Sequence, residues 1–471
     1  MAGNYQANPA PGKFGHEADQ LGLECYVIGG FVRDYLLYGQ PKNDFDIVVV
    51  GSGIALAKKM KERLGDDCSL AVYKNFGTAA LKFRDQEFEF VGARKESYRR
   101  DSRKPTVEDG TLEDDQNRRD FTINALAVSL NRQNLGQLLD PFDGLNDLRR
   151  KVIRTPLEPN ATFSDDPLRI MRAIRFACQH KLDIDPDTFS AMVDMKDRLE
   201  IVSQERITEE LNKIILSKQP SYGFKLLFAC GILGVIFPQM ERLQGIKVKN
   251  GKRHKDNFYH TLQVLDNTSA VSDNLWLRWA AILHDIAKPA TQRFHPKAGW
   301  TFHGHEDLGS KWVPGIFKKL KLPLNEKMLY VKKLVKLHLR PIALVKEEVT
   351  DSAVRRLLYE AGDDIDDLMM LCKADITSKN HNKVKEYLSN FKKVERKLQE
   401  VEEKDQVRNF QYPVTGKDIM TLYNLPPGQL IGKAKELVKE AILDGEIPNE
   451  KVAAMDLIAR FMHENGIQSD T

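Results

Sequence analysis

The chain has 471 residues, too long for a single hydrophobic core, so two to four domains are expected. Its 71 basic and 67 acidic residues nearly cancel, which excludes a uniformly basic nucleic-acid-binding protein. Five cysteines without a C-x-x-C pair exclude a zinc ribbon and a disulfide framework, and they favour the reducing cytoplasm. No segment has the apolar stretch of a signal peptide or a membrane-spanning helix, so we expect no membrane association.

Short β-rich runs alternate with helical intervals from about residue 26 to residue 154. The charged segment 92–119 contains few large apolar residues, so it is expected to be a mobile loop. Strand signals almost vanish after residue 156, where apolar residues recur at helical spacing, and the mixed charges of 384–408 are typical of a long exposed helix. The pattern predicts an α/β head followed by an all-α body.

Two aspartates stand at the entrance of an otherwise apolar strand, in the run DFDIVVV. Because strand side chains alternate, Asp44 and Asp46 share one face, while Phe45 and Ile47 can enter the core. Two neighbouring carboxylates repel each other, and a magnesium ion with its preference for oxygen ligands and phosphates would remove that cost. A hairpin bend with capping aspartates is the alternative interpretation.

Upstream of this strand, Gly29 and Gly30 would let the backbone approach a ligand and place amide groups where a phosphate could bind. Arg33 could add a charge-assisted bond to a triphosphate, with Asp34 orienting it or capping the turn. The ordered combination of glycines, arginine and carboxylates therefore indicates a site for a metal-bound nucleotide.

The run GGFVRDYLLYGQPKNDFDI resembles the signature of the class II nucleotidyltransferases, the family of the CCA-adding enzymes and the bacterial poly(A) polymerases. The resemblance implies a polymerase-β-like nucleotidyltransferase head in which the two aspartates are the catalytic Mg²⁺ ligands. A second motif, RRDFTINALAV, implies sugar recognition by Arg119, Asp120 and Asn124, and the alternative is an Arg119–Asp120 salt bridge that packs a helix. Glu89, in the family-like run FEFVGARKESY, is a candidate third acidic group beside the metal pair.

The run FSDDPLRIMRAIRF resembles the nucleobase-binding motif of the family and implies roles for Asp165, Asp166 and Arg169. In a helix, Asp166 and Arg169 would share a face and present an acceptor beside a fixed donor fork. Cytosine and adenine complement this order, whereas uracil and guanine reverse it, a mismatch that would cost on the order of a few kcal/mol. Asp165 is one methylene shorter than the usual Glu of the family, and it could also cap the helix.

The run VSQERITEELNKIILSKQP resembles the neck motif of the family, which implies that Glu205 and Arg206 fix the helix behind the base-reading face. A solvated helix face is the alternative, since Glu205 and Glu209 are four residues apart. The segment 412–455 is similar to C-terminal segments of bacterial CCA-adding enzymes, and its lysine-rich helix could bind tRNA phosphates or face solvent.

Histidines and aspartates of the second half follow an order similar to the HD superfamily of metal-dependent phosphohydrolases. They are His260, His284, Asp285, His305, His338 and Asp375. Imidazole and carboxylate ligands together suit a divalent transition metal, and the resemblance implies a second, phosphohydrolase activity on RNA ends. A metal-free body that only grips tRNA is the alternative, and His303 could replace His305 because both flank Gly304.

These runs predict four regions: a catalytic head at 22–155, a neck with nucleobase-recognition helices at 156–225, an HD-type helical body at 226–390 and a tRNA-binding helical tail at 391–471. The resemblance implies a cytoplasmic enzyme that adds CCA to tRNA 3′ ends from CTP and ATP with Mg²⁺; no oligomeric state is predicted. The alternatives are a poly(A) polymerase, a partial enzyme that adds only CC or only A, and an HD phosphohydrolase with a nucleotide-sensing head.

Overall fold

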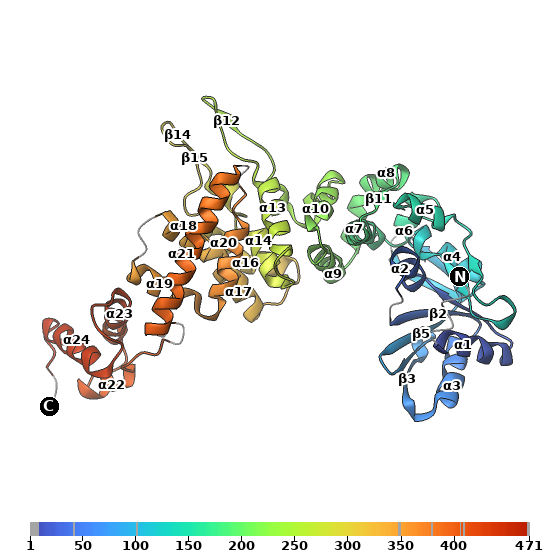
Figure 1. The fold of residues 1–471 in the computed structure, drawn as a ribbon, viewed down its shortest axis with the longest axis horizontal. Coiled ribbons are helices and arrows are strands. Elements are labelled where there is room, and N and C mark those ends of the chain that lie inside the picture. The colour runs from blue at the N-terminus through green and yellow to red at the C-terminus, as the bar shows by residue number, and fades with distance from the viewer. Residues whose placement is uncertain are drawn as a thin grey trace. The chain divides into compact units, whose positions relative to one another are not determined.

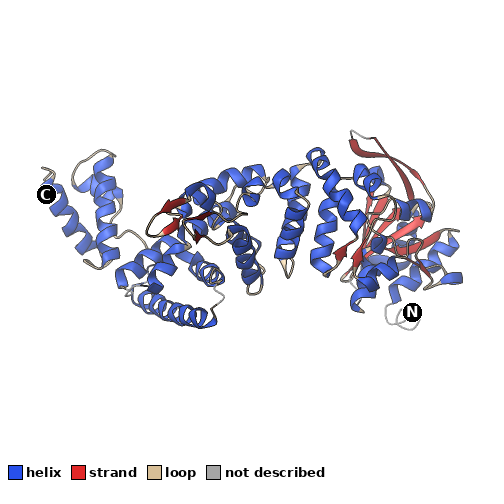
Figure 2. Ribbon diagram, turned by 90° about the horizontal axis from the view of Figure 1, so that it is seen from above, coloured by secondary structure: helices blue, strands red, loops and turns tan. Residues whose placement is uncertain are grey.

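The computed structural model describes residues 9–40, 43–99, 102–346, 350–377, 380–405, 407 and 410–468. The chain divides into two compact units, Met1–Glu241 and Arg242–Thr471, each considered separately below (Figure 1). The main sheet belongs to the first unit, whereas helices dominate the second (Figure 2). The predicted α/β head and all-α body are therefore confirmed.

The head is built on a seven-stranded mixed sheet with the order β3-β4-β5-β2-β1-β8-β9. Its strands are β1 Glu24–Ile28, β2 Asp44–Val50, β3 Cys68–Tyr73, β4 Thr78–Phe83, β5 Gln86–Gly92, β8 Ala127–Ser129 and β9 Leu138–Leu139. Central strand β2 pairs antiparallel with β1 and parallel with β5. This pairing places the entrance of β2 beside the start of β5, where both strands carry acidic side chains on one face.

Aromatic side chains fill the opposite face of these two strands. Phe31 of helix α2 (Gly30–Tyr38) stacks on Phe45 of β2 with ring centroids 4.4 Å apart, and Phe45 stacks on Phe88 of β5 at 4.7 Å. Because Phe45 and Phe88 alternate with the carboxylates along their strands, burying the rings holds the acidic groups on the other face.

The expectation of a mobile loop at 92–119 is wrong. The segment contains two strands and a helix: β6 Arg94–Arg99, β7 Ser102–Asp109 and α4 Leu112–Asn117. The strands form an antiparallel hairpin, and Thr111 begins the helix with a capping box. Ion pairs and apolar contacts both hold the segment: the Glu96 carboxylate lies 2.8 Å from Arg94 and 3.3 Å from Arg118, and Ala93 and Leu112 belong to a buried apolar cluster of the head.

Eight helices follow the sheet in the first unit: α5 Gly144–Arg150, α6 Pro159–Asp165, α7 Leu168–His180, α8 Pro186–Met195, α9 Gln204–Ile215, α10 Pro220–Ala229, α11 Ile232–Ile236 and α12 Pro238–Glu241. Helix α7 packs against α9 and α10. Its apolar residues are buried on that side, which turns the arginines of α7 toward the sheet of the head.

The second unit is a helical body with two protruding hairpins (Figure 1). Its main helices are α13 Asn257–Ser269, α14 Leu275–Leu283, α16 His305–Lys319, α17 Glu326–Leu337, α18 Leu339–Lys346, α19 Asp351–Ala361, α20 Ile365–Ala374 and α21 His381–Asp405. The long helix predicted from the mixed charges is α21, but it is not exposed all round. Its face with Phe391, Val394, Leu398 and Val401 is buried, and the helix packs on α18 and α19.

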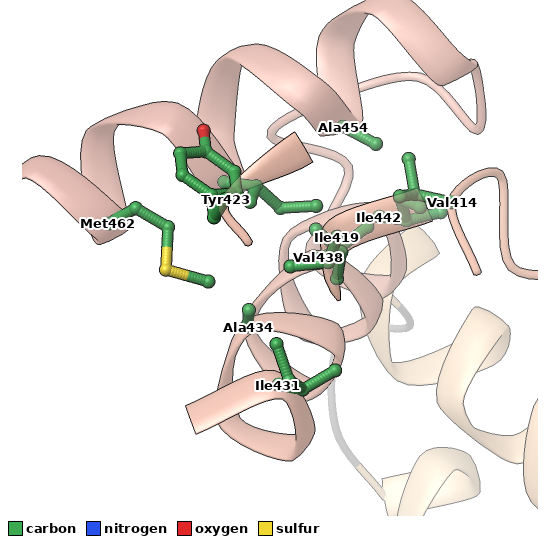
Figure 3. Close-up of a cluster of buried hydrophobic side chains, with 10 residues drawn as sticks. Val414, Ile419, Tyr423, Ile431, Ala434, Val438, Ile442, Ala454 and Met462 are labelled. Carbon is green, nitrogen blue, oxygen red and sulfur yellow. The ribbon is translucent and has the colours of Figure 1, made fainter. Parts of the chain in front are cut away.

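The C-terminal part of this unit has a hydrophobic core of its own (Figure 3). Three helices form it: α22 Gly416–Leu422, α23 Gln429–Asp444 and α24 Lys451–Glu464. The buried residues of this C-terminal core begin at Val414. Helix α21, in contrast, runs without a break across residue 390, where the predicted helical body ends and the predicted tail begins. On the lysine-rich helix α23, Lys439 pairs with Glu436 and Glu440, while Lys433 is exposed.

All five cysteines are buried, and none of them forms a disulfide bond. Burial raises the pKa of Cys230 to about 12, and it also raises the pKa of Cys25 and Cys372. Among the described residues, no helix combines the length and the apolar character that crossing a bilayer requires.

Candidate nucleotide and metal sites

A cavity of about 750 Å³ opens in the first unit where β2, α2 and α7 converge. Every residue predicted for catalysis or nucleotide binding lines it, with the exception of Asp165 and of the candidate third acidic group, Glu89. Residues distant in the sequence, from Gly29 to Arg206, therefore meet around one space. A volume of this size is ample for a nucleotide.

The carboxylates predicted to hold a metal lie at the edge of this cavity. Asp44 is exposed and Asp46 is partly buried, and the register of β2 with β5 places Glu89 opposite Asp46. Burial raises the pKa of Asp46, an effect that Arg119 opposes and Asp44 reinforces. Burial, Asp46 and Asp44 raise the pKa of Glu89 in the same way. An all-oxygen cluster of mutually repelling carboxylates fits a hard divalent cation such as Mg²⁺.

Gly29 allows the backbone to approach this cluster closely. It lies at the N-cap of α2 with a φ of 77°, a conformation that side-chain-bearing residues rarely adopt. A Cβ atom there would lie 3.0 Å from the Arg119 guanidinium and 3.4 Å from the Asp46 carboxylate. The absence of a side chain keeps the cavity open between the metal ligands and the first amides of α2, which begins at Gly30.

The residues of the predicted sugar site form a hydrogen-bonded chain. Arg33 donates to Asn124 and to Asp34, both at 2.7 Å, and the Asn124 amide donates to Asp120 at 2.9 Å. Asp120 also accepts from Arg172 at 2.8 Å. Burial alone would raise the pKa of Asp120, but Arg172 and Asn124 outweigh it and lower that pKa to about 2.

The alternative of an Arg119–Asp120 salt bridge is wrong. Arg119 instead pairs with Asp115 at 2.9 Å, and Asp120 pairs with Arg172 at 2.7 Å. The two neighbouring residues thus have separate partners, and both line the cavity.

The prediction that Asp166 and Arg169 share a helix face is wrong. Helix α7 begins only at Leu168, and Asp166 is extended, with a φ of −138°. Pro167 explains the difference, because proline disfavours helical backbone in the residue before it. Asp166 accepts a hydrogen bond from the Leu168 amide at 3.2 Å, and it still faces the cavity.

Arg169 lies in the first turn of α7 and is 8% exposed. Its guanidinium donates to the carbonyl of Thr162 at 3.3 Å and to that of Arg118 at 2.5 Å, so its orientation is fixed by backbone. Asp165 is the last residue of α6 and does not cap α7, contrary to expectation. That contact belongs to Asp166.

Two further arginines of α7 and an aromatic ring complete the cavity wall. Arg175 lies 3.9 Å from the Phe176 ring centroid, and Arg33 approaches the same ring at 4.7 Å. Glu210 of α9 holds Arg175 at 2.5 Å. Arg169, Arg172 and Arg175 recur at every third residue and therefore share this face of α7; from the sequence, Arg172 and Arg175 were expected either to reach a phosphate or to form surface ion pairs.

The neck pair divides between two environments. Arg206 lines the nucleotide cavity, so it is not confined to the structural task that the sequence suggested. Glu205 is exposed in the first turn of α9. The cavity therefore receives cations from two helices as well as from the head.

A second cluster lies in the second unit, where the six predicted histidines and aspartates meet. Asp285 is its centre: one carboxylate oxygen lies 3.1 Å from His305, and the other lies 3.2 Å from His284 and 3.4 Å from His260. Asp375 lies 2.9 Å from His260, and the His338 imidazole lies 3.9 Å from Asp285. His303 is exposed, so His305 is the residue that belongs to the cluster.

The histidines of this second cluster are oriented as metal ligands. In His284, His305 and His338 the Nδ1 atom lies 2.8 Å from the carbonyl oxygen three residues earlier, so Nδ1 carries the proton. Each Nε2 atom then turns a lone pair toward Asp285, and none of the three has a hydrogen-bond partner. Unprotonated nitrogens around a buried carboxylate fit a divalent cation.

Burial keeps His338 in its ligating form: it lowers the pKa of His338 to about 3, so the imidazole is neutral at physiological pH. Burial would also lower the pKa of His260, but hydrogen bonds to Asp285 and Asp375 outweigh it and raise that pKa to about 9, so His260 would have to release a proton when it binds a cation. Lys288 lies 2.5 Å from the Asp285 carboxylate and helps to hold the pKa of Asp285 well below its usual range against the effect of burial.

Comparison with known families agrees with both sites. The family described as "Poly A polymerase head domain" matches residues 25–154. A second family, described as "Probable RNA and SrmB- binding site of polymerase A", matches residues 181–243. The HD domain family matches 257–379. The nucleotide cavity is lined by residues of the first match, by Arg206 of the second and by side chains from 166–176, which lie between the two matches; the histidine cluster falls within the third match.

Curated relatives give the same assignment. An A-adding tRNA nucleotidyltransferase of Deinococcus radiodurans is 33% identical over 71% of this chain and 76% of its own length. A multifunctional CCA protein of Nitrosococcus oceani is 33% identical over 64% of this chain and 71% of its own length.

Solved structures share the fold. The CCA-adding enzyme of Bacillus stearothermophilus in complex with CTP is 22% identical, with a TM-score of 0.66 over 99% of this chain and 98% of its own. The Thermotoga maritima CCA-adding enzyme complexed with tRNA is also 22% identical, with a TM-score of 0.60 over 97% of this chain and 95% of its own. The chain therefore belongs to the tRNA nucleotidyltransferase family with a poly(A) polymerase head and an HD domain, the family that includes the multifunctional CCA proteins.

Proposed function

We propose that this enzyme completes the 3′ end of tRNA by adding C, C and A from CTP and ATP without a template. One observation carries the proposal: paired carboxylates, a close backbone approach and a wall of arginines surround one cavity. The carboxylates would ready a triphosphate, and the arginines would bind its phosphates.

In this mechanism Asp44 and Asp46 would hold Mg²⁺, with Glu89 as the neighbouring acidic group. The ion supplies charge neutralisation on the triphosphate and lowers the barrier to attack by a hydroxyl group. The tRNA 3′ hydroxyl attacks the α-phosphorus, and pyrophosphate leaves. Arg33 positions Asn124 through their hydrogen bond, so that Asn124 and Asp120 can bind the sugar.

Base selection is assigned to Asp166 and Arg169. Arg169 is held by two carbonyl oxygens, which leaves its remaining N–H groups in a fixed direction at the cavity wall. Asp166 offers an acceptor beside it. Cytosine and adenine present the matching amino donor and ring-nitrogen acceptor, whereas uracil and guanine would leave buried groups unpaired.

Replacing Asp166 by Asn should relax this selection. An amide can donate as well as accept, so the preference for CTP over UTP in kcat/KM is expected to fall roughly 10- to 100-fold. The ratio is measured on a tRNA transcript that ends before CCA. Asp165→Asn, one residue earlier and outside the cavity, is the matched control and should keep the ratio; equal loss with both nucleotides in D166N would contradict the assignment.

The complete activity is tested with tRNA transcripts that end before CCA, after C and after CC, each supplied with labelled CTP or ATP. Stepwise addition of C, C and A supports the proposal. Addition of C to the first two transcripts alone, or of A to the third alone, would identify a partial enzyme; the A-adding relative of Deinococcus radiodurans is named for the second of these activities. Adenylate tails on any RNA would indicate a poly(A) polymerase.

We assign a task to each region of the chain. Residues 22–155 perform catalysis, 156–225 recognise the base, 226–390 carry the HD centre and 391–471 contact tRNA. The absence of disulfide bonds among the five cysteines is in keeping with action in the reducing cytoplasm.

A second activity is favoured by the unpartnered Nε2 atoms around Asp285. We propose that His260, His284, Asp285, His305, His338 and Asp375 bind a divalent transition metal and hydrolyse phosphoesters at damaged RNA ends. A metal held by these residues would supply an activated water for attack on phosphorus. In this assignment the chain's own carbonyls fix the imidazoles, and Lys288 supplies a positive charge beside Asp285.

Substitutions at two neighbouring histidines can distinguish a metal site from a cluster that is only structural. His305→Ala should reduce the bound transition metal to less than about a tenth of the wild-type content, because a buried ligand is lost. His303→Ala removes an exposed imidazole two residues away and should retain the metal. Elemental analysis after dialysis measures both, and nucleotide addition should persist in both variants. Equal metal content in the two variants would refute the assignment.

A further inference from the structure

Two basic hairpins protrude from the helical body of the second unit (Figure 1). Their strands are β12 Val248–Lys249, β13 Lys252–Arg253, β14 Arg293–His295 and β15 Gly299–Thr301. The sequence has no acidic residue between Glu241 and Asp256, and none between Asp285 and Glu306. In a chain whose charges nearly cancel, these are two local concentrations of positive charge.

The cations of the hairpins are free to meet a ligand. Lys247, Arg253, Arg293 and Lys297 are all exposed. Among the described residues no carboxylate forms an ion pair with any of the four, although ion pairs are frequent elsewhere in the chain. Unpaired cations on protruding strands are a surface suited to a polyanion.

The two hairpins are tied together into one surface. Lys252 of the first donates to the carbonyls of Pro296 and Lys297 in the second at 3.2 and 2.6 Å, and the Trp300 indole donates back to the Lys252 carbonyl at 3.1 Å. Lys249 lies 5.1 Å from the ring of Phe294. Hydrogen bonds from side chains to main-chain carbonyls, together with a cation–π contact, therefore hold the two hairpins against each other.

Aromatic rings lie between the cations. Trp300 packs against Phe294 at 5.3 Å and against His254 at 5.6 Å, and His254 also contacts Phe302 at 5.8 Å. Phe294, Trp300, His254 and Phe302 are each only partly buried. Rings of this kind interleaved with cations are the combination that stacks bases and binds backbone phosphates of single strands.

Phe302 connects this surface with the histidine cluster. Its carbonyl accepts from His305 at 2.8 Å, and its ring lies 5.7 Å from the ammonium group of Lys288, which in turn contacts Asp285. The chain therefore runs from the second hairpin directly into a residue of the metal cluster. A strand bound on the hairpins would have its end beside that cluster.

We propose that the two basic hairpins are a binding surface for single-stranded RNA that delivers an RNA end to the histidine–aspartate centre. The choice of RNA as the polyanion rests on the phosphohydrolase function proposed for that centre. The exposed cations bind the phosphates, and Trp300 and Phe294 stack with bases.

The test compares two full-length variants in which four charges are removed. The hairpin variant carries Lys247→Gln, Arg253→Gln, Arg293→Gln and Lys297→Gln. The matched control carries Lys311→Gln, Lys318→Gln, Lys319→Gln and Lys327→Gln, four exposed lysines of α16 and α17 without ion pairs among the described residues. The probe is a 12-nucleotide single-stranded RNA with a 3′-phosphate, which cannot accept a nucleotide.

Binding is measured over a range of salt concentrations. The hairpin variant should bind roughly tenfold more weakly than wild type, and the slope of log K against log salt should fall by about 0.7 for each phosphate contact that is lost. The control should match wild type in both. Equal losses in the two variants, or no loss in either, would overturn the proposal.

Crosslinking identifies the surface independently of any catalysis. With 4-thiouridine in the probe, crosslinked peptides of wild type should map to 246–255 and 291–302, and crosslinks elsewhere alone would overturn the proposal. Hydrolysis of the 3′-phosphate tests the function of the centre separately. If the hairpins crosslink and no hydrolysis occurs with any added divalent metal, the phosphohydrolase function fails and the RNA surface stands.

Discussion

Asp46→Asn is expected to lower the rate of nucleotide incorporation by roughly 10³-fold, because a metal that acts on the triphosphate contributes several kcal/mol. The measurement is single-turnover addition of labelled CTP to a tRNA that ends before CCA. Glu87→Gln is the matched control. Glu87 of β5 lies on the same face of the sheet as Asp46 of β2, but its side chain is exposed and pairs with Lys82 at 3.0 Å. Its activity should stay within about twofold, as for other surface charges.

The same substitution should leave the stability of the first unit unchanged or raise it. Burial raises the pKa of Asp46, so in the absence of a metal the ionised carboxylate opposes folding above its ordinary pKa. An uncharged amide removes this cost. Urea unfolding at pH 7 is the check, and added Mg²⁺ and CTP should stabilise wild type but not the variant. Loss of stability in parallel with activity would instead assign Asp46 a structural role.

Asp120→Asn should have the opposite effect on stability. Asp120 is buried, and its pKa is lowered to about 2 because Arg172 and Asn124 outweigh the effect of burial. A folded-state pKa of about 2, against an ordinary value of 3.8, corresponds to roughly 2.5 kcal/mol of stability at neutral pH. The variant should lose this amount in urea unfolding at pH 7, and nucleotide addition should fall because Asn124 loses a fixed partner.

The pH dependence of the stability difference between wild type and Asp120→Asn is the control for this prediction. A lowered pKa contributes stability that is fully present above the unfolded-state pKa and is lost as the pH falls through the folded-state pKa. The difference between wild type and Asp120→Asn should therefore be constant from pH 7 to about pH 5 and narrow between about pH 4 and pH 2. A difference that does not depend on pH would show that shape rather than charge is at work.

Local patterns in the sequence were enough to predict how the two carboxylates of β2 are placed. Alternation along DFDIVVV assigns Asp44 and Asp46 to one face without knowledge of the partner strands. The position of Glu89 opposite Asp46 depends on the parallel pairing of β2 with β5, which is a long-range contact. The extended backbone of Asp166 could have been predicted, since Pro167 is visible in the sequence.

The hairpin at 94–109 could not be recognised from composition. Taken one at a time, its charged residues indicate a segment that is exposed to solvent. In the fold, however, Glu96 pairs with Arg118, which is 22 positions away in the sequence. The choice between His303 and His305 is similar. Both flank Gly304, and only the fold determines which imidazole is buried beside Asp285.

The burial of all five cysteines gives the wild-type chain a practical property. Alkylating reagents require an accessible thiolate, and burial removes the access while it raises the pKa of Cys25, Cys230 and Cys372. Maleimide dyes should thus leave the native protein unlabelled. One cysteine introduced on the surface of each unit would carry a donor or an acceptor fluorophore, and energy transfer between them would report the separation of the units through every round of nucleotide addition.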